Sequence, residues 1–173
     1  MKGLMMKKLP SEVQGVLAAP YKAPPIKGLL ADGSRYRAAD DKGGWIVLYF
    51  YPKDMTSGCT TEAQDFQASL PAFRQLGARV IGVSRDSCAR HVQFLEKAGL
   101  TFALIADEEA DLCEAFDVWK EKKLYGRSYM GVLRSTFLID PKGRLVAAWR
   151  GVKVPGHVDT VLKTLRSLVS ATH

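Results

Sequence analysis

One short segment of this 173-residue chain, PKDMTSGCTTE (residues 52–62), combines the residue types that nucleophilic chemistry needs. Cys59 lies there among hydroxyl side chains, directly after the apolar run WIVLYFY (45–51). The run predicts a strand buried on both faces, and the pattern after Cys59 predicts a helix. Unpaired amides and the macrodipole at a helix start favour a thiolate over a thiol. We therefore expect a reactive cysteine at the carboxyl end of a strand, rather than a small buried hydrophobe.

The elements around this segment predict an α/β fold. Helical spacing continues from Cys59 to Gly77, with a kink at Pro71, because proline lacks an amide hydrogen to donate. A turn at Pro141-Lys142-Gly143 makes the last two strands an antiparallel hairpin. The order β-α-β-α-β-α-β-β-α predicts a thioredoxin-like fold, in which a central mixed sheet (parallel βαβ plus antiparallel ββα) is flanked by helices. The later strands are expected at residues 79–84, 102–106, 135–140 and 144–150, and the final helix carries Val158, Val161, Leu162 and Leu165.

The length predicts one domain with a short extension. Residues 1–24 contain several prolines and are expected to be an irregular lead-in to a domain over residues 25–173. Asp32-Gly33 is a turn signal that could close a small hairpin. Residues 119–131 carry many lysines and glycines, and we expect a loop there.

Composition excludes several classes of protein. Apolar residues make up 47% and charged residues 25%, as in ordinary globular domains. No apolar run approaches the length of a membrane span, and the N-terminus lacks a signal-peptide core, so we expect a cytoplasmic protein without a membrane partner. Three cysteines are too few for a disulfide framework. The three histidines, His91, His157 and His173, have no metal-site spacing; we expect them at the surface or at helix caps, and we expect no metal or cofactor.

The net charge of +7 is concentrated outside residues 54–119, which are acidic overall. A basic surface can attract nucleic acid. However, basic runs do not exceed pairs such as Lys122-Lys123, and no aromatic residues are interleaved with a basic stretch. The charge therefore indicates a solvated surface, with no nucleic-acid partner.

The segment FYPKDMTSGCTTEAQDF (50–66) resembles the active site of peroxiredoxins, in particular of the bacterioferritin-comigratory or Q-type subfamily. The family pattern Pro-x-x-x-Thr-x-x-Cys is matched by Pro52, Thr56 and Cys59. The likeness continues through ARVIGVSRDS, DVWKEKKLYGRSYMG and RSTFLIDPKGRLV, and it covers roughly residues 25–168. Ser57 departs from the subfamily, which usually has proline at that position.

The resemblance implies a thiol-dependent peroxidase that reduces hydrogen peroxide and alkyl hydroperoxides through a cysteine sulfenic acid. Cys59 would be the peroxidatic nucleophile, Thr56 would supply a hydroxyl, Arg134 would supply a fixed cation, and Pro52 would shield the sulfenic acid from water. Glu62 is either a helix-surface charge or part of the hydrogen bonds around Arg134. The resemblance further implies recycling by thioredoxin, glutaredoxin or a small thiol, and it favours a monomer.

The resolving cysteine is where the chain departs from its family. The two usual positions hold Gln64 and Leu95. Cys113 lies in an inward-facing apolar pattern and is expected to be a buried structural thiol. Cys88 opens the helix after strand 79–84, at the same sheet edge as Cys59. Two outcomes stay open: a Cys59–Cys88 disulfide after local unwinding, or a one-cysteine cycle with an external thiol.

Two other functions remain as alternatives. A thioredoxin-like disulfide oxidoreductase would need a second cysteine close to the first, usually as Cys-x-x-Cys, but position 62 is glutamate. A redox-inert basic binding module would not lose a thiol rapidly when mixed with peroxide.

Overall fold

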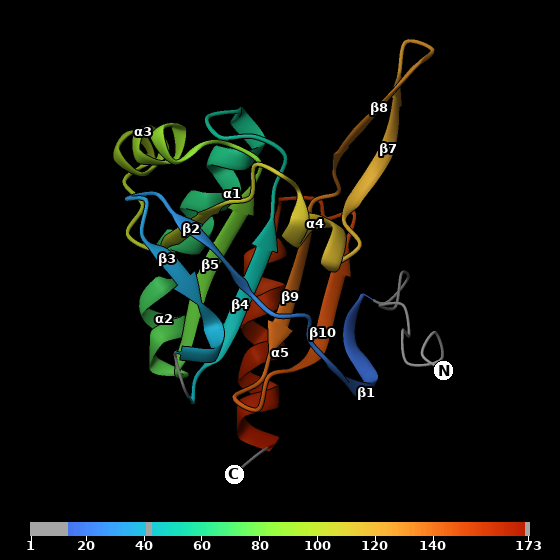
Figure 1. Cartoon of the computed structure of the whole chain (residues 1–173). Coiled ribbons are helices and arrows are strands. Elements are labelled where there is room, and N and C mark those ends of the chain that lie inside the picture. Colours follow the sequence, from blue (N-terminus) through green and yellow to red (C-terminus); the bar gives the residue numbers. More distant parts are fainter. Residues whose placement is uncertain (1–13, 41–42, 172–173) are drawn as a thin grey trace.

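The computed structural model describes residues 14–40 and 43–171, and its centre is an eight-stranded sheet in the order β1-β10-β9-β4-β5-β6-β2-β3 (Figure 1). β4 (Trp45–Phe50) lies in the middle, and all six of its residues are buried. It pairs in parallel with β5 (Ala78–Ser84), which pairs in parallel with β6 (Ala103–Ala106). The continuous apolar run of β4 thus has the environment that its pattern predicts, with side chains buried on both faces.

The other side of β4 carries the antiparallel half of the sheet. β9 (Ser135–Ile139) pairs with β4, and β10 (Arg144–Arg150) pairs with β9 through a turn that contains Gly143 at φ +81°. Parallel βαβ units followed by an antiparallel ββα unit are the predicted thioredoxin-like arrangement, which is confirmed.

Helices cover both faces of the sheet. Val47, Tyr49 and Tyr51 point to the face that packs against α1, α2, α3 and α5, whereas Ile46 and Leu48 point to the face that holds α4. This alternation follows from the two-residue period of a strand. The helices are α1 (Ser57–Ala68), α2 (Leu70–Gln75), α3 (Cys88–Ala98), α4 (Asp111–Ala115) and α5 (His157–Ala171), with a short 3-10 turn at Ala38–Asp40.

The kink expected at Pro71 is a complete break. α1 ends at Ala68, and α2 starts at Leu70 with Pro71 in its first turn, where a missing amide hydrogen costs no helical hydrogen bond. The second helix is therefore a separate element that packs against β5.

The expected irregular lead-in is wrong for part of its length. Gly15–Lys22 forms β1, an edge strand that pairs antiparallel with β10. The pairing shifts register between Val16 and Tyr21, which accommodates Pro20, since proline cannot donate to a ladder but is tolerated at an irregular sheet edge. Residues 1–13 lie outside the described residues. The hairpin expected around Asp32-Gly33 is confirmed as β2 (Lys27–Leu30) and β3 (Arg35–Arg37).

The loop expected over residues 119–131 is also wrong. β7 (Trp119–Leu124) and β8 (Arg127–Val132) form an antiparallel hairpin that stands out from the body of the molecule (Figure 1). Its two-residue turn, Tyr125-Gly126, has φ values of +51° and +77°, as a type I′ hairpin turn requires. The hairpin buries little of itself, so it lacks the apolar alternation by which a strand is recognised in sequence.

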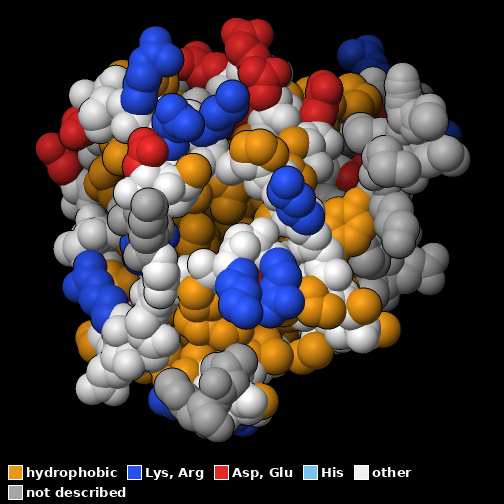
Figure 2. Space-filling model, turned by 60° about the horizontal axis from the view of Figure 1, so that its bottom comes forward, with side chains coloured by type: hydrophobic (Ala, Val, Ile, Leu, Met, Phe, Trp, Pro, Cys, Tyr) orange, Lys and Arg blue, Asp and Glu red, His pale blue; other side chains and the backbone are white. Residues whose placement is uncertain are grey.

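Hydropathy and surface charge can be followed along the described residues. Within the two described ranges, no helix is both long and apolar enough to span a membrane. On the face drawn in Figure 2, Lys and Arg side chains lie in small separate groups between apolar and uncharged surface. That face, as far as it is described, has no continuous basic track of the kind that follows a nucleic-acid backbone.

Candidate active site

Cys59 is the third residue of α1, and only 1% of its surface is exposed. Thr56 is the N-cap residue, with extended φ and ψ, but its side chain makes no capping hydrogen bond. The amides in the first turn of α1 are therefore not taken by the cap side chain. Such amides and the helix dipole favour negative charge at this position.

Arg134 reaches Cys59 because of the strand register. Phe50, the last residue of β4, is paired with Ser135, the first residue of β9. Arg134 directly precedes β9 and so lies beside the segment that leaves β4 toward α1. Its Nη2 donates to the Cys59 sulfur at 3.5 Å, which places a cation against the thiol. The two residues expected to act together are 75 positions apart in sequence and in contact in the fold.

Glu62 lies three residues after Cys59, on the same side of α1, and accepts a hydrogen bond from Arg134 Nη1 at 2.6 Å. The sequence analysis left its role open; it belongs to the hydrogen bonds around Arg134. Burial raises the pKa of Glu62 to about 7, although the positive charge of Arg134 opposes that rise. One guanidinium thus contacts both the nucleophile and a fully buried carboxyl group, and its orientation is set by both.

Pro52 and Thr56 are exposed in the segment that leads from β4 to α1. The Thr56 hydroxyl donates to the Lys53 carbonyl at 2.9 Å. That bond uses its proton, so the oxygen keeps lone pairs that can accept a hydrogen bond from a protonated peroxide. Beside the first turn of α1 is a hollow of about 420 Å³ lined by Ser57, Gly58, Thr61, Val154 and Pro155.

Two further residues near Arg134 were missed in the sequence. Lys122 of β7 donates to the Val132 carbonyl at 2.7 Å, and burial together with the charge of Arg134 lowers its pKa. His157 of α5 contacts the Thr136 hydroxyl through Nε2 at 2.8 Å. Burial, then the charge of Arg134, lowers the pKa of His157 to about 4, so the ring is neutral at pH 7. Lys122 could not be found from sequence because the hairpin that carries it was not recognised.

The surface or capping roles expected for the histidines are wrong for two of them. His157 is buried, and His91 is completely buried in α3. Both nitrogens of His91 and Nε2 of His157 contact partners far away in sequence, which no local pattern indicates. His173 lies outside the described residues.

The two other cysteines have different surroundings. Cys88 is the first residue of α3; it is half-buried, and its thiol donates to the Leu30 carbonyl at 3.3 Å. Cys113 is fully buried, as predicted, and burial followed by a hydrogen bond with Asp107 raises its pKa far above the usual value. Cys113 is therefore an inert thiol. In the described part of the chain, no group of three or more His, Cys, Asp or Glu side chains could hold a metal ion.

Comparison with known proteins agrees with this geometry. The model of the AhpC/TSA family matches residues 20–148. Peroxiredoxin Bcp of Bacillus subtilis is 54% identical over 147 residues, which is 85% of this chain and 94% of the relative. Peroxiredoxin Bcp of Xanthomonas campestris is 51% identical over 138 residues, or 80% of this chain and 86% of the relative.

Solved structures show the same relationship. Peroxiredoxin Q of Xanthomonas campestris superposes with a TM-score of 0.80 at 46% identity, covering 91% of this chain and 98% of that one. A structure of the bacterioferritin comigratory protein of the same organism, determined in a study of its alkyl peroxide reduction, has a TM-score of 0.80 at 45% identity and covers 92% and 99% of the two chains. The chain therefore belongs to the AhpC/TSA family, among its Bcp or Q-type peroxiredoxins, and is a thiol-dependent peroxidase.

Proposed function

We propose that Cys59 is the peroxidatic nucleophile, that Arg134 and Thr56 contact the peroxide, and that Pro52 shields the oxidised sulfur. The observation that carries this proposal is the 3.5 Å contact between Arg134 Nη2 and the Cys59 sulfur at an uncapped helix start. A cation and free amides around one thiol are the surroundings expected of a reactive thiolate.

The chemical step follows from these positions. The Cys59 thiolate attacks the terminal oxygen of a hydroperoxide; the O–O bond breaks, an S–O bond forms, and the sulfur becomes a sulfenic acid. The other oxygen leaves with the electron pair of the broken bond and takes up a proton to become water or an alcohol. Negative charge moves from sulfur to oxygen, and a guanidinium held by Glu62 stabilises that charge without reorienting. Thr56 accepts a hydrogen bond from the peroxide hydroxyl and orients it.

The substrates we propose are hydrogen peroxide and alkyl hydroperoxides. The hollow beside α1 has a polar side of Ser57 and Thr61 and an apolar side of Val154 and Pro155. Its volume of about 420 Å³ can accept a short alkyl chain beside the helix turn that carries Cys59. The alkyl peroxide reduction named for the Xanthomonas campestris relative supports the same substrate class.

We propose that an external thiol, from thioredoxin, glutaredoxin or a small molecule, reduces the Cys59 sulfenic acid directly. Cys59 faces Arg134, whereas the Cys88 thiol faces Leu30 of β2. A Cys59–Cys88 disulfide, the alternative, would require the starts of α1 and α3 to unwind toward each other. We further propose a monomer that works in the reducing cytoplasm, where such thiols are kept reduced.

The test treats reduced protein with one equivalent of hydrogen peroxide under non-reducing conditions and maps the product by mass spectrometry. Sulfenic acid on Cys59, full loss of activity in Cys59→Ser and unchanged cycling in Cys88→Ser are expected. A peptide linking Cys59 to Cys88, with over-oxidation in Cys88→Ser, would instead establish the disulfide route. Cys59→Ser with undiminished turnover would overturn the proposed site, and sedimentation velocity checks the monomer.

A further inference from the structure

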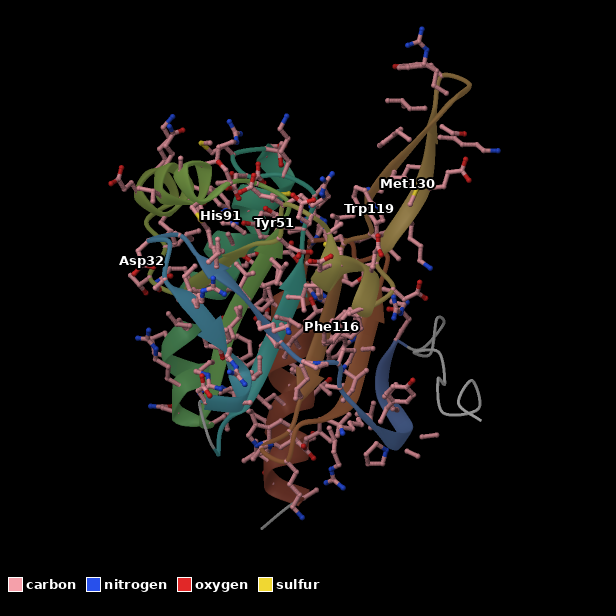
Figure 3. All side chains as sticks on the ribbon, viewed as in Figure 1. Asp32, Tyr51, His91, Phe116, Trp119 and Met130 are labelled. Atoms are coloured by element: carbon pink, nitrogen blue, oxygen red, sulfur yellow. The ribbon has the colours of Figure 1, made fainter. Side chains whose placement is uncertain are left out.

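We call residues 52–56, which lead from β4 into α1, the catalytic loop. Behind it lies a buried cluster of three polar side chains, Tyr51, Asp54 and His91, whose hydrogen bonds do not include Cys59. Asp54 is 1% exposed, and the other two are fully buried. The Tyr51 hydroxyl donates to Asp54 Oδ1 at 2.6 Å, and His91 Nδ1 lies 2.6 Å from Asp54 Oδ2. Figure 3 shows the Tyr51 and His91 side chains close together between α3 and the sheet.

Both nitrogens of His91 face acceptors. Nε2 lies 3.0 Å from the Ile105 carbonyl oxygen, which can only accept, and Nδ1 lies against a carboxylate oxygen. The ring thus joins the loop, through Asp54, to β6, through Ile105. Removing one partner of a buried pair leaves the other without compensation, so the cluster ties its three segments together firmly.

Asp54 lies at a sensitive place in the loop. The residue before it, Lys53, supplies the carbonyl that accepts the Thr56 hydroxyl. The residue after it, Met55, has φ +65°, a left-handed conformation that non-glycine residues adopt only where the surroundings hold them. The Asp54 amide is also held, by a 2.8 Å hydrogen bond to the Asp86 carboxylate. Residues 53–55, which lead to Thr56, are therefore held by α3, by the segment between β5 and α3 and, through His91, by β6.

We propose that Asp54 and His91 are positioning residues of the peroxidase. Their buried 2.6 Å contact holds residues 52–56 in the strained conformation that presents the Thr56 hydroxyl and the first turn of α1 to the peroxide. Without the pair, Met55 can relax to a negative φ, and the Lys53 carbonyl and Thr56 move with it. The inference rests on the proposed role of Cys59, and it adds to that role the two residues that keep the substrate-contacting groups in place.

The experiment separates positioning from stability. Asp54→Ala and His91→Leu are each expected to lower Tm, whereas the double variant, in which neither partner is left unpaired, recovers most of it. The second-order rate of Cys59 oxidation by hydrogen peroxide, followed by stopped-flow fluorescence, should nevertheless stay about 10- to 100-fold below wild type in the double variant. Wild-type rates in a folded double variant would overturn the proposal.

Two controls complete the design. Asp140→Asn removes the buried carboxylate that forms an ion pair with Arg144 in the β9–β10 turn. This variant should have a lower Tm and an unchanged rate of Cys59 oxidation. In a Thr56→Val background, loss of the pair should slow oxidation far less than in wild type, because the pair acts through Thr56. Equal slowing in the wild-type and Thr56→Val backgrounds would contradict the proposal. If the other variants do not fold, the milder Tyr51→Phe and Asp54→Asn variants are compared in the same two backgrounds. Cys59→Ser is measured in parallel, and peroxidase activity in that variant would overturn the proposed nucleophile. If Cys59→Ser is inactive but the double variant is oxidised at the wild-type rate, only the positioning role is overturned.

Discussion

Two helix starts at the same edge of the sheet each carry a cysteine, and their surroundings are opposite. In α1, Cys59 has a guanidinium at 3.5 Å, and the N-cap side chain makes no capping bond. In α3, Cys88 donates to a carbonyl at 3.3 Å, and the Ser87 hydroxyl caps the helix by accepting from the Arg90 amide at 3.2 Å. The start of α1 is open to an anion, whereas the start of α3 is closed by its own side chain.

The comparison extends one turn further along both helices. Three residues after Cys59 is the buried Glu62, which holds Arg134 against the thiol; three residues after Cys88 is the buried His91, which holds Asp54 and the catalytic loop. α1 thus carries the proposed nucleophile and the carboxyl group that holds Arg134, whereas α3 anchors the loop of residues 52–56. We therefore expect the reactivity of a cysteine here to depend on the neighbouring charge and the unfilled cap, and not on its place at a helix start alone.

The largest expected effect comes from exchanging the two cysteines for serine. Cys59→Ser should reduce peroxide consumption to the background rate, since among the described residues Cys59 is the thiol that accepts a hydrogen bond from a guanidinium. Cys88→Ser should leave the peroxide step unchanged. Steady-state peroxide consumption with a thiol reductant, together with circular dichroism to confirm folding, measures both. Comparable losses in the two variants would remove the distinction between the helix starts.

Removing the Arg134 cation should make Cys59, at the start of α1, react with peroxide as poorly as Cys88, at the start of α3. Arg134→Ala is expected to slow sulfenic acid formation by about 10²- to 10³-fold, the usual cost of a lost charge-stabilising donor. Arg134→Lys should recover little, because a single ammonium group cannot replace the fixed fork that bonds Cys59 and Glu62 together. Stopped-flow oxidation by hydrogen peroxide gives the rates; an Arg134→Lys variant at wild-type speed would show that charge alone suffices.

Glu62 should leave a signature in the pH dependence of stability. Its pKa is raised from 4.5 to about 7, so the folded state binds more protons than the unfolded state between these pH values. The contribution of this group is complete below pH 4.5 and is lost as pH rises through 7, a change on the order of 3 kcal/mol. Glu62→Gln should remove that slope from the free energy of unfolding, measured by urea denaturation from pH 4.5 to 8. If the free energy of unfolding of Glu62→Gln depends on pH as that of the wild type does, the titrating group is not Glu62.

The smallest effects should distinguish the two N-cap residues. Ser87→Ala removes a capping bond and should cost about 1 kcal/mol of stability with no change in the peroxide rate. Thr56→Ala removes no capping bond, so it should cost less stability but slow the peroxide step. Urea denaturation and stopped-flow oxidation of both variants test this crossed pattern, and a larger loss of stability in Thr56→Ala would break it.

Much of the fold and the centre of the site could be predicted from sequence because they depend on local patterns. The apolar run of β4, the start of α3 at Cys88 and the turn before Gly143 each have a local physical cause. The resemblance then connected Cys59 with Arg134, whose contact the strand register explains. The anchoring of Asp54 by His91 spans 37 residues and is decided by tertiary packing, so no window of sequence contains it.

Other failures arose where burial is low. β1 and the β7–β8 hairpin lie at the edge or outside the main sheet, so their strands need no apolar alternation.

Glu62 could not be assigned because a charged residue on a helix is usually solvated, and only the fold places it at 0% exposure beneath Arg134.

The protruding β7–β8 ribbon also bears on how copies of the protein behave in concentrated solution. Among the described residues neither of its strands pairs with a third, and Tyr125, Tyr129, Leu124 and Met130 are exposed on it. Bare strand edges with apolar side chains are templates for aggregation, but Lys120, Lys122, Lys123 and Arg127 place positive charge along the same ribbon. Repulsion between such ribbons opposes their pairing. Because salt screens this repulsion, self-association through the ribbon should increase with ionic strength.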